Sequence, residues 1–320
     1  SKNGFETKTI SINPRPKIPQ AVSIQLITTE EAYWASRPEV ISTPLGNKLK
    51  LFKPNDEVFS MGAPRREPGR RANEAEKRIQ LQRPFYFAIT ETSNKEYRQW
   101  KSEHNSSSIR GLSLDLNDQP VANIAWQDAA LFCNWLSEKE NLPKFYNVVG
   151  DRVTSINWDS NGYRLPTESE WSWVAKVTKA GSTKVFPWNS PSYPPPFVSG
   201  NYADESAKSM LPFTISNYND SFPVSASVGS FRPNEKGIFN LSGNVAEWVN
   251  DFYEIRVNKS EPLVDYRGPN TGNRHVIRGA SWALGSRSEL RLSYREPGNN
   301  GKIDVGFRIA RYVDKPKGDL

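Results

Sequence analysis

The chain has 320 residues and a formal charge of +7, and aromatic residues are common while Cys and Met are scarce. That length supports one large domain, or a domain with an extension. The single cysteine, Cys133, excludes an intrachain disulfide, and no apolar run approaches the ~20 residues that a membrane-spanning helix needs. The basic residues of segment 65–71 are interleaved with Glu67 and Glu74, so we expect a solvated mixed-charge loop and no nucleic-acid partner.

Residues 1–45 differ from the rest of the chain. Their short β-like alternation is broken by Pro14, Pro16 and Pro19, which indicates an extension or linker, a remnant of an upstream module. A compact domain is expected over residues 46–313, followed by a polar tail over residues 314–320. The chain begins with Ser1 and shows no signal-like apolar segment, so we expect that any targeting segment has been removed.

Three helices are predicted in the compact domain. The first begins at Ser93, which forms a capping box with Glu96. The second covers residues 125–141 and places Cys133 on its apolar face, where we expect a small buried side chain and not a reactive thiol. The third starts at Thr167, which forms a capping box with Glu170. The rest reads as short β segments joined by turns, which predicts an α+β architecture with a large loop fraction.

Four ordered motifs carry a family resemblance. They are NGYRLPTESEW (161–171), GIFNLSGNVAEW (237–248), VIRGASW (276–282) and DVGFRIAR (304–311). Together with segments 58–77, 83–97 and 120–137, they resemble the formylglycine-generating enzyme (sulfatase-modifying factor) domain, a variant of the C-type-lectin-like fold. The resemblance implies an α+β, loop-rich fold with few helices and short β strands.

The residues that carry the family's redox chemistry are absent. In formylglycine generators, two cysteines after a Gly-Gly-Ser segment bind copper(I), for which thiolates are natural ligands. Here Leu284 falls at the first cysteine position and Arg287 near the second. The ergothioneine-synthesis relatives hold iron with three histidines, and this chain has only His104 and His275. We therefore expect no copper, no three-histidine iron site and no formylglycine synthesis by the known mechanism.

The resemblance also implies calcium, which family members bind through Asn, Asp and carbonyl oxygens, the hard ligands that this ion prefers. The first implied site consists of Asn201, the Tyr202 carbonyl, Asp220 and the Phe222 carbonyl. The second consists of Asn244, the Val245 carbonyl and Glu247. The alternative is that these polar groups only cap turns.

Four arginines, Arg164, Arg278, Arg295 and Arg308, recur inside the motifs among apolar or aromatic residues. A guanidinium can satisfy several backbone carbonyls at once, so we expect mainly structural roles. The functional alternative is an anion or carboxylate pocket near Arg287 and Arg291.

Three functions remain open. The first is a non-catalytic binding or scaffold domain for a peptide or glycan, in a bacterial envelope or secretion setting, with a periplasmic or cell-envelope location favoured. Because exposed Trp and Arg often anchor such surfaces, the expected ligand groove consists of Trp248, Ser281, Trp282, Leu284, Arg287 and Arg291. The second function is an enzyme with other chemistry, whose candidate residues are Ser281, Glu289, Tyr294 and Glu296. The third is an activating partner of another enzyme. The sequence does not predict an oligomeric state.

Overall fold

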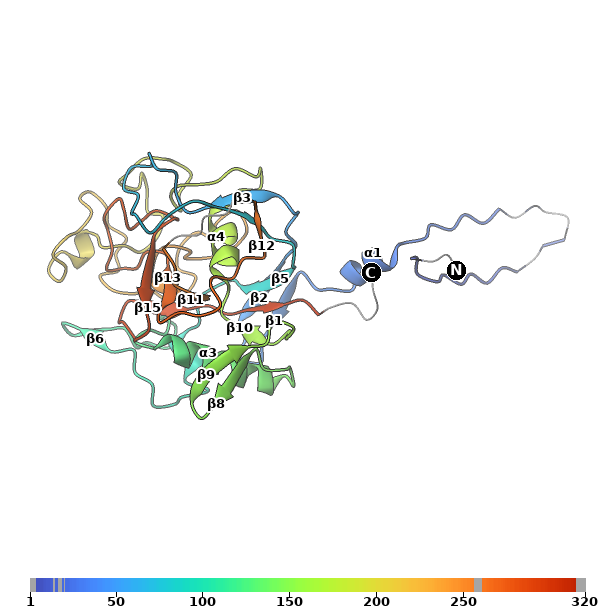
Figure 1. Cartoon of the computed structure of the whole chain (residues 1–320), viewed down its shortest axis with the longest axis horizontal. Helices are drawn as coiled ribbons and strands as arrows, with labels where there is room; N and C mark the ends of the chain where they lie inside the picture. Colours follow the sequence, from blue (N-terminus) through green and yellow to red (C-terminus); the bar gives the residue numbers. More distant parts are fainter. Residues whose placement is uncertain (1–3, 14, 17–18, 20, 256–260, 315–320) are drawn as a thin grey trace. The chain divides into compact units, whose positions relative to one another are not determined.

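The computed structural model describes residues 4–13, 15–16, 19, 21–255 and 261–314. Internal contacts divide the chain into two units, Ser1–Val40 together with Asp314–Leu320, and Ile41–Val313 (Figure 1). The expected boundary near residue 45 therefore lies close to the start of the larger unit. Pro14 and residues 315–320 of the expected tail lie outside the described residues.

The smaller unit contains a helix that the sequence did not lead us to expect. Helix α1 (Thr29–Ala35) begins after Thr28, whose side chain and that of Glu31 form a capping box. The Tyr33 hydroxyl donates a hydrogen bond to the carbonyl of Asp314. Among the described residues before α1 there is an isolated bridge between Phe5 and Thr28 but no strand, so the β-like alternation predicted for this segment does not form a sheet.

The larger unit is built from short strands. A five-stranded sheet has the order β1 (Val40–Ser42), β2 (Lys48–Phe52), β5 (Phe85–Ala88), β16 (Ala310–Tyr312) and β10 (Tyr163–Arg164). A four-stranded sheet has the order β14 (Arg295–Gly298), β13 (His275–Arg278), β11 (Ala246–Phe252) and β15 (Val305–Phe307). A third sheet joins β12 (Leu263–Val264), β4 (Lys77–Gln80) and β3 (Val58–Met61), and two hairpins pair β6 (Ser108–Ile109) with β7 (Leu112–Ser113) and β8 (Tyr146–Val149) with β9 (Arg152–Ile156).

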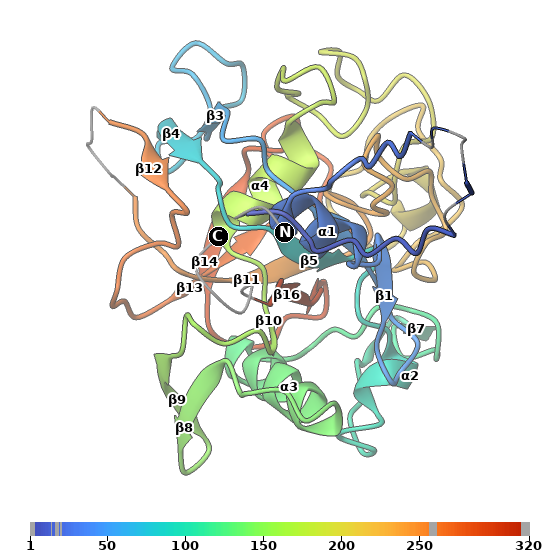
Figure 2. The same ribbon diagram turned by 90° about the vertical axis from the view of Figure 1, so that its right-hand side faces the viewer.

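The predicted helices of this unit are confirmed. Helix α2 (Asn94–Tyr97) and helix α4 (Glu168–Lys176) both start with the expected capping boxes, at Ser93 and Thr167. Helix α3 (Trp126–Lys139) buries Cys133, and that burial raises the pKa of its thiol. Figure 2 shows the β8–β9 hairpin beside α3. A single turn of 3-10 helix covers Glu205–Ala207. With its few helices, short strands and long loops, the unit has the α+β architecture that the sequence predicts.

Strand β11 lies at the centre of the four-stranded sheet, antiparallel to β13 and parallel to β15. All its residues but the last are buried, and the fully buried indoles of Trp171, Trp248 and Trp282 are among the largest side chains of the core. The motif glycine of β15, Gly306, lies so close to a neighbouring segment that a Cβ there would be 2.4 Å from the Val121 carbonyl oxygen. Only glycine fits such a contact without a backbone shift. Among the described residues, no helix has both the length and the apolar character that crossing a membrane requires.

We predict that Gly306→Ala destabilises the domain by about 3 kcal/mol, because overpacking against backbone atoms cannot be relieved by a side-chain rotation. Gly111→Ala is the matched control, since a Cβ at Gly111 meets nothing within 4 Å and the residue has φ of +83°. That control should lose only about 1 kcal/mol, through the positive φ. Urea unfolding of both variants measures the two losses, and equal losses would show that the contact with Val121 is easily relieved.

Candidate functional site

The position implied for the first copper ligand is filled by apolar packing. Leu284 packs against a buried cluster that includes Trp188, Tyr202 and Ile215. Two residues earlier, Trp282 packs into a second cluster, with Leu114, Val224 and Val245. The only thiol of the chain is buried in α3. Leu284 offers no thiolate, the ligand type that copper(I) prefers.

The predicted ligand groove is not an open surface. The side chains of Trp248, Ser281, Trp282 and Arg291 are at most 1% exposed, while Leu284 and Arg287 are half-buried. The Trp248 indole N–H donates to the Ile124 carbonyl at 3.0 Å, deep in the core. The prediction of exposed tryptophan anchors is therefore wrong. In a domain with so little regular structure, large aromatic side chains fill the space between loops.

Among the predicted enzyme residues, Ser281 is not accessible to a substrate. The Ser281 hydroxyl donates to Asp304 at 2.7 Å, but the serine is fully buried. Glu289 accepts hydrogen bonds from the backbone of Gly285 and Ser286 at 3.3 and 2.9 Å. Asp304, which opens the DVGFRIAR motif, is a partner that sequence reasoning missed. A buried hydroxyl that donates to a carboxylate cannot attack a substrate that does not reach it.

The first implied calcium site brings its residues together. Asp220 accepts from the backbone N–H of Tyr202 at 3.0 Å and from that of Phe222 at 2.9 Å. The Asn201 amide nitrogen donates to the Val224 carbonyl at 2.8 Å, while its buried Oδ1 has no hydrogen-bond partner in the described structure. Burial of polar oxygens without a partner is uncommon, and a hard cation is one group that satisfies them.

A second acidic residue, which the sequence reading missed, joins this loop. Asp204 is fully buried and accepts a hydrogen bond from the backbone of Asp220. Burial, together with the nearby Asp204 charge, raises the pKa of Asp220 to about 7. Since no three acidic, His or Cys side chains of the described chain converge on one point, a calcium ion here would rely on amide and carbonyl oxygens as well. Were calcium bound in this loop, Asn201, Asp220 and the carbonyls of Tyr202 and Phe222 would be its ligands.

The second implied calcium site does not fit the ion. Glu247 forms a two-point ion pair with Arg308 at 2.6 and 2.7 Å and also accepts from the Trp171 indole at 2.9 Å. Asn244 accepts from the Ala226 backbone at 2.8 Å and donates to Glu91 at 3.1 Å. A cation at this place would have to displace a buried guanidinium. The buried residues Asn244, Val245 and Glu247 therefore belong to the core of the domain.

Arginine–glutamate pairs form the main polar network of the domain. The closest contacts are Arg164–Glu170 at 2.6 Å, Arg291–Glu74 at 2.6 Å, Arg295–Glu168 at 2.7 Å, Arg308–Glu247 at 2.6 Å and Arg278–Glu168 at 3.5 Å. Both side chains of each of these pairs are buried. The structural interpretation of the motif arginines is therefore confirmed. Arg291 belongs to the same class, so the alternative of an anion pocket at Arg291 is wrong, because Glu74 and Glu67 already neutralise it.

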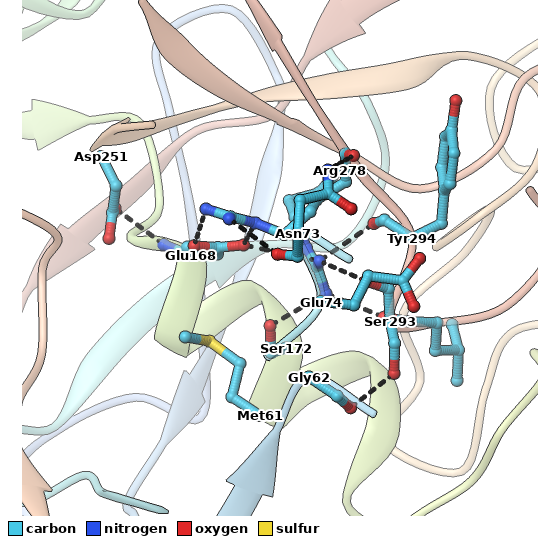
Figure 3. A network of polar contacts seen from close by, with 12 residues as sticks. Met61, Gly62, Asn73, Glu74, Glu168, Ser172, Asp251, Arg278, Ser293 and Tyr294 are labelled. Carbon is cyan, nitrogen blue, oxygen red and sulfur yellow. Dashed lines mark hydrogen bonds and ion pairs between the residues drawn. The ribbon is translucent and has the colours of Figure 1, made fainter. Parts of the chain in front are cut away.

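Figure 3 shows the centre of this network, around Arg278. Its guanidinium donates to the carbonyls of Leu292, Ser293 and Tyr294 at 2.8, 3.2 and 2.9 Å. Although burial opposes ionisation, the adjacent Arg295 and Arg278 hold the pKa of Glu168 down to about 2.

Among the described residues, Asp251 is the carboxyl of this network with no cation at ion-pair distance. It accepts the backbone N–H of Glu168 at 2.8 Å, and its other oxygen is buried with no hydrogen-bond partner in that part of the chain. Burial and the negative charge of Glu168 raise the pKa of Asp251 to about 8. An aspartate in the unfolded chain has a pKa of about 3.9, so the folded protein holds the carboxyl proton of Asp251 more tightly. The stabilisation from Asp251 is therefore complete below about pH 4 and is lost as the pH rises toward 8.

We predict that Asp251→Asn changes the free energy of unfolding more favourably at pH 8 than at pH 5. The amide keeps an oxygen that accepts the Glu168 N–H, and it carries no charge at either pH. Urea unfolding at both pH values measures the difference. The control is Asp118→Asn, since Asp118 is exposed. That variant should show no such pH dependence, and an identical effect of Asp251→Asn at both pH values would contradict the assignment.

For the first calcium site, we predict that calcium at a hundredfold excess over its Kd raises the free energy of unfolding by about 2.7 kcal/mol relative to EDTA at equal ionic strength. Asp220→Asn should abolish this increment. Glu247→Gln, at the site that does not fit, should lower stability but keep the calcium increment. Thermal and urea unfolding provide the readout, and a wild-type transition indifferent to calcium would refute the site.

A family model described as "Sulfatase-modifying factor enzyme 1-like domain" matches residues 36–313. A formylglycine-generating enzyme of Streptomyces coelicolor is 28% identical over 207 residues, 63% of this chain and 55% of that protein. A chaperone protein LppX of Paenibacillus barcinonensis is 28% identical over 250 residues, 71% of this chain and 80% of that protein. An inactive C-alpha-formylglycine-generating enzyme 2 of Mus musculus is 26% identical over 289 residues, 79% of this chain and 83% of that protein.

The matched region covers about half the length of the formylglycine-generating enzyme of Streptomyces coelicolor. Among solved structures, Treponema denticola variable protein 1 aligns with a TM-score of 0.67 and 23% identity, over 87% of this chain and 100% of that one. PvdO from Pseudomonas aeruginosa aligns with a TM-score of 0.65 and 21% identity, again over 87% and 100%. These structural likenesses confirm the fold. With a family model over most of its length, the chain belongs to the sulfatase-modifying factor family.

Proposed function

We propose that this protein is a non-catalytic binding or scaffold domain of its family. The observation that carries the proposal is the packing of Leu284, which puts a half-buried apolar contact where the first thiolate is expected. A metal site that depends on thiolates has no ligands there, and the only cysteine lies in the core of α3. The hydroxyl of Ser281, three residues before this position, is closed off from solvent.

Two relatives support the proposal. One carries the name of an inactive formylglycine-generating enzyme, and the similarity covers 83% of its length. Another carries the name of a chaperone, with 80% of its length covered. We accordingly assign to this chain a role in binding a peptide, protein or glycan, in a bacterial envelope or secretion setting. Activation of a partner enzyme is a second candidate, which the match to a chaperone favours.

The expected result of a direct activity test is negative. Purified protein is loaded with copper(I), or with iron(II), and incubated aerobically with a cysteine peptide that the Streptomyces coelicolor relative converts. We expect no aldehyde product by mass spectrometry and less than one equivalent of either metal after desalting, because the thiolates are missing. The relative serves as the positive control. Aldehyde formation, or one tightly held transition metal per chain, would overturn the non-catalytic assignment.

A further inference from the structure

A cavity of about 520 Å³ lies outside every site considered so far. Its walls come from Trp126 at the start of α3, residues 153–156 of β9, Trp158, β11, His275 of β13 and the loop 267–273. Small-molecule sites in proteins usually have volumes of roughly 300–1,000 Å³ and combine aromatic walls with a few fixed polar groups. None of the residues of the predicted ligand groove lines this cavity in the described structure.

His275 is held as a fixed hydrogen-bond acceptor in the lining. Its imidazole stacks between Trp126, with ring centroids 3.5 Å apart, and Phe252, at 4.4 Å. Nδ1 lies 3.2 Å from the carbonyl of Asn250, which can only accept, so Nδ1 carries the proton. Burial lowers the pKa of His275 to about 4, which keeps the ring neutral at physiological pH. The backbone of Asp251 is a second hydrogen-bonding neighbour of the ring. Because Nδ1 carries the proton, Nε2 is an acceptor.

Asn250 supplies a fixed donor beside it. The residue is only 2% exposed and lines the cavity. The Tyr146 hydroxyl accepts the backbone N–H of Leu165 at 3.1 Å, so its own proton goes to Asn250 Oδ1 at 3.0 Å. This bond orients the amide and leaves Nδ2 without a protein partner in the described structure.

We propose that this cavity binds the acetamido group of an N-acetylated amino sugar. An acetamide presents one carbonyl oxygen and one N–H, which match the donor of Asn250 and the acceptor of His275. The half-buried side chains of Trp158 and Phe252 offer apolar surface to the sugar ring and the acetyl methyl group.

The remaining lining favours a sugar over a peptide. The rim carries hydroxyl and amide side chains, at Thr154, Ser155, Asn270 and Asn299, and all four are exposed. Such groups both donate and accept hydrogen bonds, as sugar hydroxyls require. The lining contains no carboxylate, and its one cation is Arg267, which lies 4.2 Å from the Trp158 ring centroid. The cavity therefore suits a neutral ligand rich in hydroxyl groups.

Saturation-transfer NMR tests the proposal with four probes, which are N-acetylglucosamine, glucosamine, glucose and N-acetylglycine N-methylamide. Wild-type protein should transfer saturation to the acetyl methyl of N-acetylglucosamine and respond weakly to the two sugars that lack an acetyl group. His275→Phe keeps an aromatic ring in the stack but removes the acceptor, and Trp158→Ala removes a half-buried wall. Each should weaken binding at least about tenfold, the equivalent of one good hydrogen bond or stacking contact.

Phe197→Ala is the matched control, because Phe197 is 53% exposed and lines a different cavity. It should leave binding unchanged, and melting curves of all variants show which remain folded. Absence of a response to N-acetylglucosamine, an equal response to glucose, or full binding by both cavity variants would overturn the proposal. A response to the peptide amide alone would replace the sugar by a peptide. The inference rests on the proposed binding function but fails separately from it, since sugar binding and aldehyde formation are measured independently.

Discussion

The larger unit depends on carboxylates that neutralise guanidinium groups inside the core. Glu168, the first residue of α4, pairs with Arg278 of β13 and with Arg295 of β14. Arg278 in turn donates to three successive carbonyls of residues 292–294. A domain with short strands leaves many backbone carbonyls without ladder partners, and a guanidinium with five donors can satisfy several at once. Removing one partner of such a buried pair typically costs about 3–5 kcal/mol, because the other charge stays buried.

The same network shows what two of the strongest motifs contribute to the fold. Glu247 and Arg308 lie inside two of the strongest motifs, and they form a buried ion pair with each other. These motif residues therefore stabilise the core. After the RGASW motif, where the resemblance implies copper ligands, Leu284 packs against an apolar cluster. Trp282, the last residue of that motif, packs in another.

Sequence reasoning predicted the local structure well where one residue decides it. The capping boxes at Ser93 and Thr167 are set by side chains within one turn, and the apolar face of α3 by its period. It failed where exposure depends on distant segments. Trp248 and Trp282 were expected to be exposed ligand anchors, but both are buried in the core. The contact between His275 and the Asn250 carbonyl could not be predicted either. It depends on how β11 and β13 align in the sheet, and the sequence does not reveal that register.

The carboxylate of Glu168 also affects how the larger unit unfolds. Helix α4 and strands β13 and β14 meet at Glu168. If one of these elements separates while the others stay folded, an unpaired charge remains in the apolar interior. Partly opened forms are correspondingly scarce. Amide protons of α4 and of the four-stranded sheet should then exchange with solvent through one concerted opening, even though the surrounding loops contain little regular structure.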